Sequence, residues 1–261
     1  MADDPGKRAV RRFLEAHDFS VGEIPEAPDV RRADLRAAHG TEEYLLEVKT
    51  GIGEETYLST LYRTGAADRE QPLGRTNAVA ARIRDGAEQV LATPSGRNAF
   101  RLVALVALGD DPETQASQFR ATLYGTVDVL TANENGSAIR TPCYFFSFSE
   151  FFRLRHIAGS LILIPGGRQL CVNTFSDRAP ELRASRLGWL FTTNGGLVDP
   201  STLEATGQAF IADCSLDRRN EEAVLQYVRG KYSLKTARTF QPKKYTASVL
   251  VRRNENGQHK T

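Results

Sequence analysis

Two acidic side chains and one lysine stand in a pattern that suits phosphodiester chemistry. Glu47 and Lys49 lie two positions apart in the segment EYLLEVK, and Asp34 lies in the preceding segment RADLRA. Both segments alternate polar and apolar residues, and the turn sequence HGTE separates them, which predicts a β-hairpin. With the turn at Gly40-Thr41, the register places Asp34 directly opposite Glu47, where side chains of neighbouring strands contact each other.

The alternation of a strand decides which side chains share a face. Lys49 is expected on the same face as Glu47, because the two are separated by one residue. The other face is apolar and is expected to be the core side, with Ala33, Leu35, Leu46 and Val48.

Two adjacent carboxylates repel each other unless a cation lies between them. Hard ions such as Mg²⁺ prefer oxygen ligands. The sequence therefore predicts a site for Mg²⁺ or Mn²⁺ on Asp34 and Glu47, with the backbone carbonyl of Val48 as a further candidate ligand. Lys49 would orient a water molecule or offset charge in the transition state.

The flanking segments predict the elements that hold this hairpin. Asp4 followed by Pro5 is typical of a helix start, and apolar spacing favours a helix over residues 5–17. Residues 50–74 are interpreted as a long loop, with a short helix near 57–62. A second helix is expected to begin at Thr76 or Asn77 and to end before Pro94. The apolar run RLVALVAL, residues 101–108, predicts a strand buried on both faces.

The segment APDVRRADLRAAHGTEEYLLEVKT resembles the active-site hairpin of the PD-(D/E)xK nuclease superfamily. Asp34 matches the motif aspartate, and Glu47-Val48-Lys49 matches the (D/E)xK tripeptide. The order of elements over residues 5–108 is also similar to the core of that superfamily. The resemblance implies an α/β fold with a restriction-endonuclease-like core, in which helices flank a mixed central sheet. It also implies a Mg²⁺-dependent endonuclease that hydrolyses DNA in restriction, repair or phage defence in bacteria or archaea.

The resemblance extends to two helix residues and leaves one alternative open. Glu15 on the first helix and Gln89 on the second match polar active-site positions of some members. The plainer interpretations are an ion pair of Glu15 with Arg11 and an exposed position for Gln89. The literal PD dipeptide ends at Asp29, which the hairpin register places opposite Ile52, beyond the expected strand end, so Asp34 is preferred.

Composition limits the other function classes. The net charge of the 261 residues is only +2, so any DNA surface must come from local clusters such as the basic face of the first helix, which a solvated face explains equally well. The three cysteines show no CxxC spacing and do not indicate a disulfide framework or a zinc site. The N-terminus lacks the apolar stretch of a signal peptide, and no apolar run is long enough to cross a bilayer, so a cytoplasmic protein is expected.

The second half of the chain is less regular. A nuclease core over residues 1–110 and an extension over 111–261 are expected. The alternative is an extension that is continuous with the core. Within the extension, strands are predicted at 121–130, 142–148, 160–164 and 168–173, and helices at 150–156, 181–190 and 219–232. This half is a candidate for contacts with DNA, a partner subunit or a second copy, and cutting of both strands favours a homo-oligomer. The alternative functions are a non-catalytic DNA-binding or scaffold subunit, and RNA cleavage.

Overall fold

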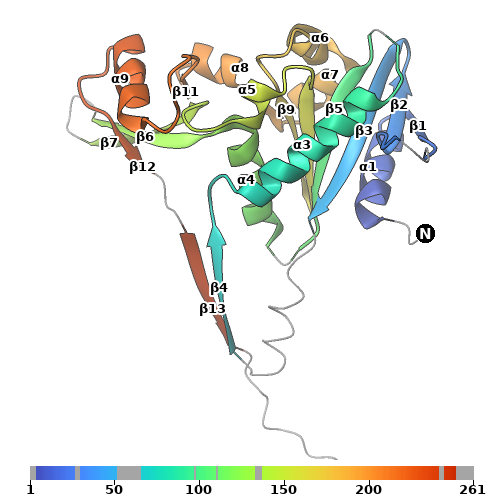
Figure 1. The fold of residues 1–261 in the computed structure, drawn as a ribbon, viewed down its shortest axis with the longest axis horizontal. Helices are drawn as coiled ribbons and strands as arrows, with labels where there is room; N and C mark the ends of the chain where they lie inside the picture. The colour runs from blue at the N-terminus through green and yellow to red at the C-terminus, as the bar shows by residue number, and fades with distance from the viewer. Residues whose placement is uncertain are drawn as a thin grey trace, which may run out of the picture.

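The computed structural model describes residues 4–26, 30–51, 66–96, 98–109, 111–132, 137–240 and 244–250. It has a mixed α/β architecture in which helices flank a mixed sheet (Figure 1). The main sheet has seven strands in the order β1-β2-β3-β5-β8-β9-β10. These strands are β1 (Ser20–Glu23), β2 (Leu35–His39), β3 (Glu42–Gly51), β5 (Phe100–Ala107), β8 (Gly159–Ile164), β9 (Gly167–Val172) and β10 (Leu197–Val198). Strands β3, β5 and β8 run parallel, and β1, β2 and β9 are antiparallel to their inner neighbours.

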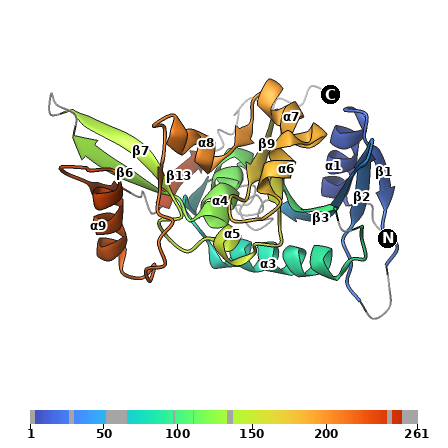
Figure 2. The ribbon, with the colours of Figure 1, turned by 90° about the horizontal axis from the view of Figure 1, so that it is seen from above.

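Helices cover both faces of this sheet (Figure 2). One face packs against α1 (Pro5–Glu15), α6 (Ala179–Ala184) and α7 (Arg186–Thr193) through a core that includes Val10, Leu14, Leu46, Leu102 and Leu187. The other face packs against α3 (Asn77–Ala92), α4 (Pro112–Tyr124) and α5 (Glu150–Arg153) through a core that includes Ile83, Val103, Leu105, Phe119 and Phe151. The hairpin strand β3 therefore lies between α1 and α3.

The remaining described strands form two smaller units. A four-stranded sheet has the order β11-β7-β6-β12 and packs against α9 (Glu221–Lys231) through its own apolar cluster. Its strands are β6 (Val127–Ala132), β7 (Ala138–Tyr144), β11 (Phe210–Ile211) and β12 (Arg238–Phe240), and α8 (Pro200–Ala205) precedes β11. A two-stranded antiparallel ribbon joins β4 (Ala66–Pro72) to β13 (Lys244–Leu250). None of the helices in the described ranges has both the length and the apolar character that crossing a membrane requires.

The hairpin has the predicted register. Leu35 pairs with Leu46 and His39 pairs with Glu42, so the turn lies at Gly40 and Thr41. Gly40 has a φ of +56°, a left-handed conformation that glycine adopts without a steric penalty.

One detail of the hairpin prediction is wrong, because Ala33 and Leu35 do not share a face. Leu35 lies in the core beside α1, whereas Ala33 lies in the core beside α3, and its N–H donates to Thr93 Oγ1 at 2.7 Å. The chain bends at Asp34, immediately before β2 begins, so the strict alternation of a strand ends there. The bend leaves the Asp34 side chain at the end of β2, beside β3.

The predicted strand over residues 121–130 is also wrong in its first part, which belongs to helix α4. The side chain of Asp111 caps this helix by accepting from the N–H of Thr114 at 3.1 Å, and Pro112 occupies its first turn. Gly125 ends the helix with a φ of 60°, and β6 begins at Val127. These start and stop signals were in the sequence, but the apolar residues near position 121 resemble a buried strand equally well.

The loop predicted over residues 50–74 contains strand β4, which pairs with β13 near the other end of the chain. A local pattern does not reveal a partner so distant in the sequence. The short helix expected near 57–62 lies outside the described residues. The main sheet contains strands from both sides of the expected boundary near residue 110, because it continues through β8, β9 and β10 to Val198.

A buried ion pair ties α6 to the start of α8. Arg183 donates to both oxygens of Asp199 at 2.7 and 2.9 Å, and Asp199 is only 3% exposed. Burial alone would raise the pKa of Asp199, but the hydrogen bonds from Arg183 and Thr202 outweigh it, so this pKa is lowered.

We expect Asp199→Ala to lower the free energy of unfolding by about 3 kcal/mol at neutral pH, because Arg183 loses its buried partner. Because the pKa of Asp199 is lowered by folding, its stabilisation is present above the unfolded pKa of about 3.9 and is lost as the pH falls through the folded value. Urea unfolding of variant and wild type should therefore differ at neutral pH and converge in acid. Asp217→Ala, which removes an exposed carboxylate bonded to Arg219, is the control, and an equal loss in that variant would contradict the prediction.

Candidate active site at the end of the hairpin

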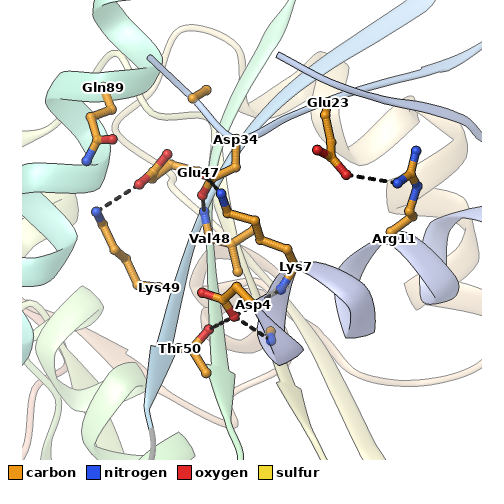
Figure 3. Close-up of polar contacts among 12 residues, drawn as sticks. Asp4, Lys7, Arg11, Glu23, Asp34, Glu47, Val48, Lys49, Thr50 and Gln89 are labelled. Carbon is orange, nitrogen blue, oxygen red and sulfur yellow. Dashed lines mark hydrogen bonds and ion pairs between the residues drawn. The ribbon is translucent and has the colours of Figure 1, made fainter. Parts of the chain in front are cut away.

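Glu47 and Lys49 share one face of β3, as their spacing predicts, and this face is turned toward α3 (Figure 3). Lys49 Nζ donates to Glu47 Oε1 at 2.8 Å and to Asp85 Oδ2 of α3 at 2.5 Å. Gly86 lets the helix approach this closely, because a Cβ at that position would lie 3.2 Å from Glu47 Cγ and 3.3 Å from Lys49 Cε. The pair is thus enclosed between β3 and α3, and Glu47 is only 4% exposed.

Asp34 reaches the same place from the bend before β2. Its Oδ2 accepts from the backbone N–H of Val48 at 2.8 Å. This side-chain oxygen takes the place of the backbone carbonyl that a longer β2 would have offered to β3. Its Oδ1 lies 2.6 Å from Nζ of Lys7 on α1. The sequence predicted that Asp34 pairs directly with Glu47 in the ladder, but the ladder begins at Leu35, and Asp34 reaches the neighbourhood of Glu47 from the bend. The contact of Asp34 with Lys7 was not predicted.

The start of α1 is fixed next to β3, and this position brings Lys7 to Asp34. Asp4 caps the helix by accepting from the N–H of Gly6 at 2.7 Å, and the same oxygen accepts from Thr50 Oγ1 at 2.9 Å. Gly6 packs so tightly against Thr50 that a Cβ there would overlap with the threonine side chain. Figure 3 shows the hydrogen bond between Thr50 and Asp4 close to the ion pair between Lys7 and Asp34.

Glu47 is a buried carboxylate whose charged form is disfavoured by its surroundings. Burial, partly offset by Lys49 and reinforced by the nearby Asp34 carboxylate, raises its pKa to about 7. Its Oε2 is buried and has no hydrogen-bond partner among the described residues. A proton or a cation is needed beside this oxygen, because a buried carboxylate oxygen without a partner costs free energy.

Lys49 and Asp85 belong to a longer chain of charges. Asp85 also accepts from Arg31 Nη1 at 2.6 Å and from Gln89 Nε2 at 2.9 Å. The hydrogen bond from Lys49 lowers the pKa of Asp85. Burial alone would lower the pKa of Lys49, but its bonds to Asp85 and Glu47 outweigh burial and raise it.

The structure brings Gln89 to the site and leaves Glu15 away from it. Gln89 is 8% exposed and contacts the cluster through Asp85, so it is not the exposed helix residue of the plainer interpretation. The side chain of Glu15 is 47% exposed and accepts from Arg11 Nε at 3.1 Å, which is the ion pair of the plainer interpretation. The helix residue that reaches Asp34 is Lys7, about two turns nearer the N-terminus than Glu15. Asp29, the alternative aspartate, lies outside the described residues.

Sequence reasoning missed Asp85 and Arg31 as members of the cluster. One signal was available for Asp85, because it stands one helical turn before Gln89 and therefore on the same side of α3. No local pattern pointed to Arg31, whose partner is on a different element.

No family model, curated protein or solved structure matches this chain. The interpretation of the site therefore depends on its residues and their geometry. Within the described ranges, no three His, Cys, Asp or Glu side chains group in a manner that could hold a metal ion. A hard divalent ion does not require three such side chains, because Mg²⁺ retains several waters and is held by one or two carboxylates.

Asp34 and Glu47 fit a divalent ion by this criterion. The buried Oε2 of Glu47 has no hydrogen-bond partner among the described residues, and the Asp34 carboxylate adds a second hard oxygen donor beside it. The Val48 carbonyl remains a candidate third donor, because in a strand the C=O and N–H of one residue point to the same side, and the N–H of Val48 points to Asp34.

Proposed function

We propose that this chain is a divalent-metal-dependent nuclease that hydrolyses DNA phosphodiester bonds with a site of the PD-(D/E)xK type on a restriction-endonuclease-like core. The observation that carries this proposal is the buried Oε2 of Glu47, which has no partner in the described structure and lies beside the Asp34 carboxylate. The arrangement of Asp34, Glu47 and Lys49 around one hairpin end supports it as well.

Asp34 and Glu47 would hold the ion, together with the Val48 carbonyl. An ion of this kind supplies Lewis acidity toward a phosphate oxygen and lowers the pKa of water. Lys49 supplies a fixed positive charge beside the same point. Since its pKa is raised, Lys49 stays protonated at neutral pH and acts as a hydrogen-bond donor and charge, not as a general base.

Asp85 and Gln89 have a positioning role in this proposal. Asp85 and Glu47 both accept a hydrogen bond from Lys49, so two carboxylates hold the ammonium group. Gln89 donates to Asp85 and orients it.

A second candidate function is favoured by one observation. Lys7 already neutralises Asp34 at 2.6 Å, and a site whose charges are balanced by lysines needs no metal ion. The chain would then be a non-catalytic subunit that uses the same fold to bind DNA or to support a complex.

Cleavage assays with metal removal separate the two functions. We expect the purified chain to cut plasmid, linear or single-stranded DNA in Mg²⁺ or Mn²⁺, to stop when EDTA is added, and to recover when the ion is restored in excess. RNA of the same length tests the substrate class. Absence of cleavage in every substrate and ion, together with no heat of Mn²⁺ binding, would favour the non-catalytic subunit.

A further inference from the structure

Both carboxylate oxygens of Asp34 are engaged by groups of the chain itself. The backbone N–H of Val48 donates to Oδ2, and the ammonium group of Lys7 lies 2.6 Å from Oδ1. The Val48 N–H is fixed within strand β3 and cannot leave without disrupting the sheet. Lys7 is different, because it is a long side chain that is 37% exposed and reaches Asp34 from a neighbouring helix.

The position of Lys7 is set by packing and not by chance contact. The cap made by Asp4 ties the first turn of α1 to Thr50 on β3, and Gly6 allows the helix to touch that strand. Lys7 follows directly on this fixed turn, and its charge faces Asp34, which is only 14% exposed. Lys7 thus occupies the open side of the oxygen that a divalent ion would use.

We propose that Lys7 is a removable stand-in for the metal ion, which holds Asp34 Oδ1 until a divalent cation displaces it. This inference rests on the proposed metal-dependent function. The ion and the ammonium group compete for the same oxygen. They cannot bind it at the same time, because two cations in contact repel each other. Lys7 therefore lowers the affinity of the site for metal and keeps the carboxylate neutralised while no ion is bound.

Calorimetric titration with Mn²⁺ of the full chain tests this competition directly. Lys7→Met should bind Mn²⁺ about tenfold more tightly than wild type. In this variant the ion no longer has to break the charge-assisted hydrogen bond between Lys7 and Asp34. Lys7→Arg keeps the competing charge and should bind no more tightly than wild type. Arg12→Met removes the same charge from an exposed position of the same helix and should leave the affinity unchanged.

The outcomes separate this inference from the proposed function. Equal Mn²⁺ affinity in wild type and Lys7→Met would overturn the role of Lys7 and leave the metal site standing. No binding in wild type, Lys7→Met and Asp34→Asn would overturn the proposed function and the inference together. Binding in Lys7→Met alone would support the inference and show that Lys7 closes the site. Circular dichroism checks that each variant is folded, and Lys7→Gln repeats the test if methionine disturbs the helix.

Discussion

Glu47→Gln is expected to reduce DNA cleavage by at least about 100-fold while the protein stays folded. Glutamine has nearly the same shape and keeps an oxygen that accepts from Lys49, so the packing of β3 against α3 is retained. It removes the negative charge that would hold the ion. The change is not expected to lower the free energy of unfolding, because burial already disfavours the charged carboxylate and raises its pKa to about 7.

Single-turnover assays measure the cleavage rate and calorimetry measures the affinity for Mn²⁺. Both the rate and the affinity are expected to fall in this variant. Asp34→Asn should behave alike, since its carboxylate is the second acidic ligand. Glu15→Gln is the matched control, because it makes the same chemical change at an exposed position that lies away from the cluster. Cleavage by Glu47→Gln at the rate of wild type would show that the site is not catalytic, and a loss in Glu15→Gln would revive the role first expected for that residue.

Lys49→Met is expected to reduce cleavage by about 100-fold or more but to retain Mn²⁺ binding. The ammonium group is not a metal ligand in this proposal, and its contribution is positive charge beside the developing charge of the transition state. Methionine fills a similar volume between Glu47 and Gly86 without that charge. Loss of Lys49 also removes a cation from Glu47, so Mn²⁺ binding is expected to be no weaker than in wild type.

Asp85→Asn distinguishes positioning from charge. Asparagine still accepts a hydrogen bond from Lys49, so a loss of about tenfold in cleavage is expected, smaller than that of Lys49→Met. Arg31→Met should have little effect, because its side chain is 74% exposed and its ion pair with Asp85 is screened by water. If Lys49→Met cleaves normally, or if it loses Mn²⁺ binding with its fold intact, the assigned role of Lys49 is wrong.

The sequence alone was sufficient for the hairpin, and it placed Asp34 near Glu47, although the bend at Asp34 was not predicted. Alternation in the two segments and the turn at Gly40 determine the register from Leu35–Leu46 to His39–Glu42, which the structure confirms. Glu47 and Lys49 share a face for the same local reason. The start of α1 at Pro5, with Asp4 as its cap, was also predictable, because a capping side chain and a proline act within one turn.

The tertiary structure decided which groups complete the site. Lys7, Arg31 and Asp85 join the cluster from three separate segments of the chain, and their contacts depend on how α1 and α3 pack on β3. Gly6 and Gly86 permit that packing, but a glycine in a sequence does not state which strand will approach it. The pairing of β4 with β13 and the continuation of the main sheet into β8, β9 and β10 likewise join segments distant in the chain.

The difference has one physical origin. Turn chemistry, capping and strand alternation act over a few residues, so Glu47 and Lys49 could be placed on one face, with Asp34 near them, before any fold was known. The balance of charge around them depends on distances across packed layers, which only the closing of the whole core determines. For this protein the local pattern therefore determined the acidic pair and Lys49. The packing of two helices decided that Lys7 pairs with Asp34 and that Asp85 pairs with Lys49.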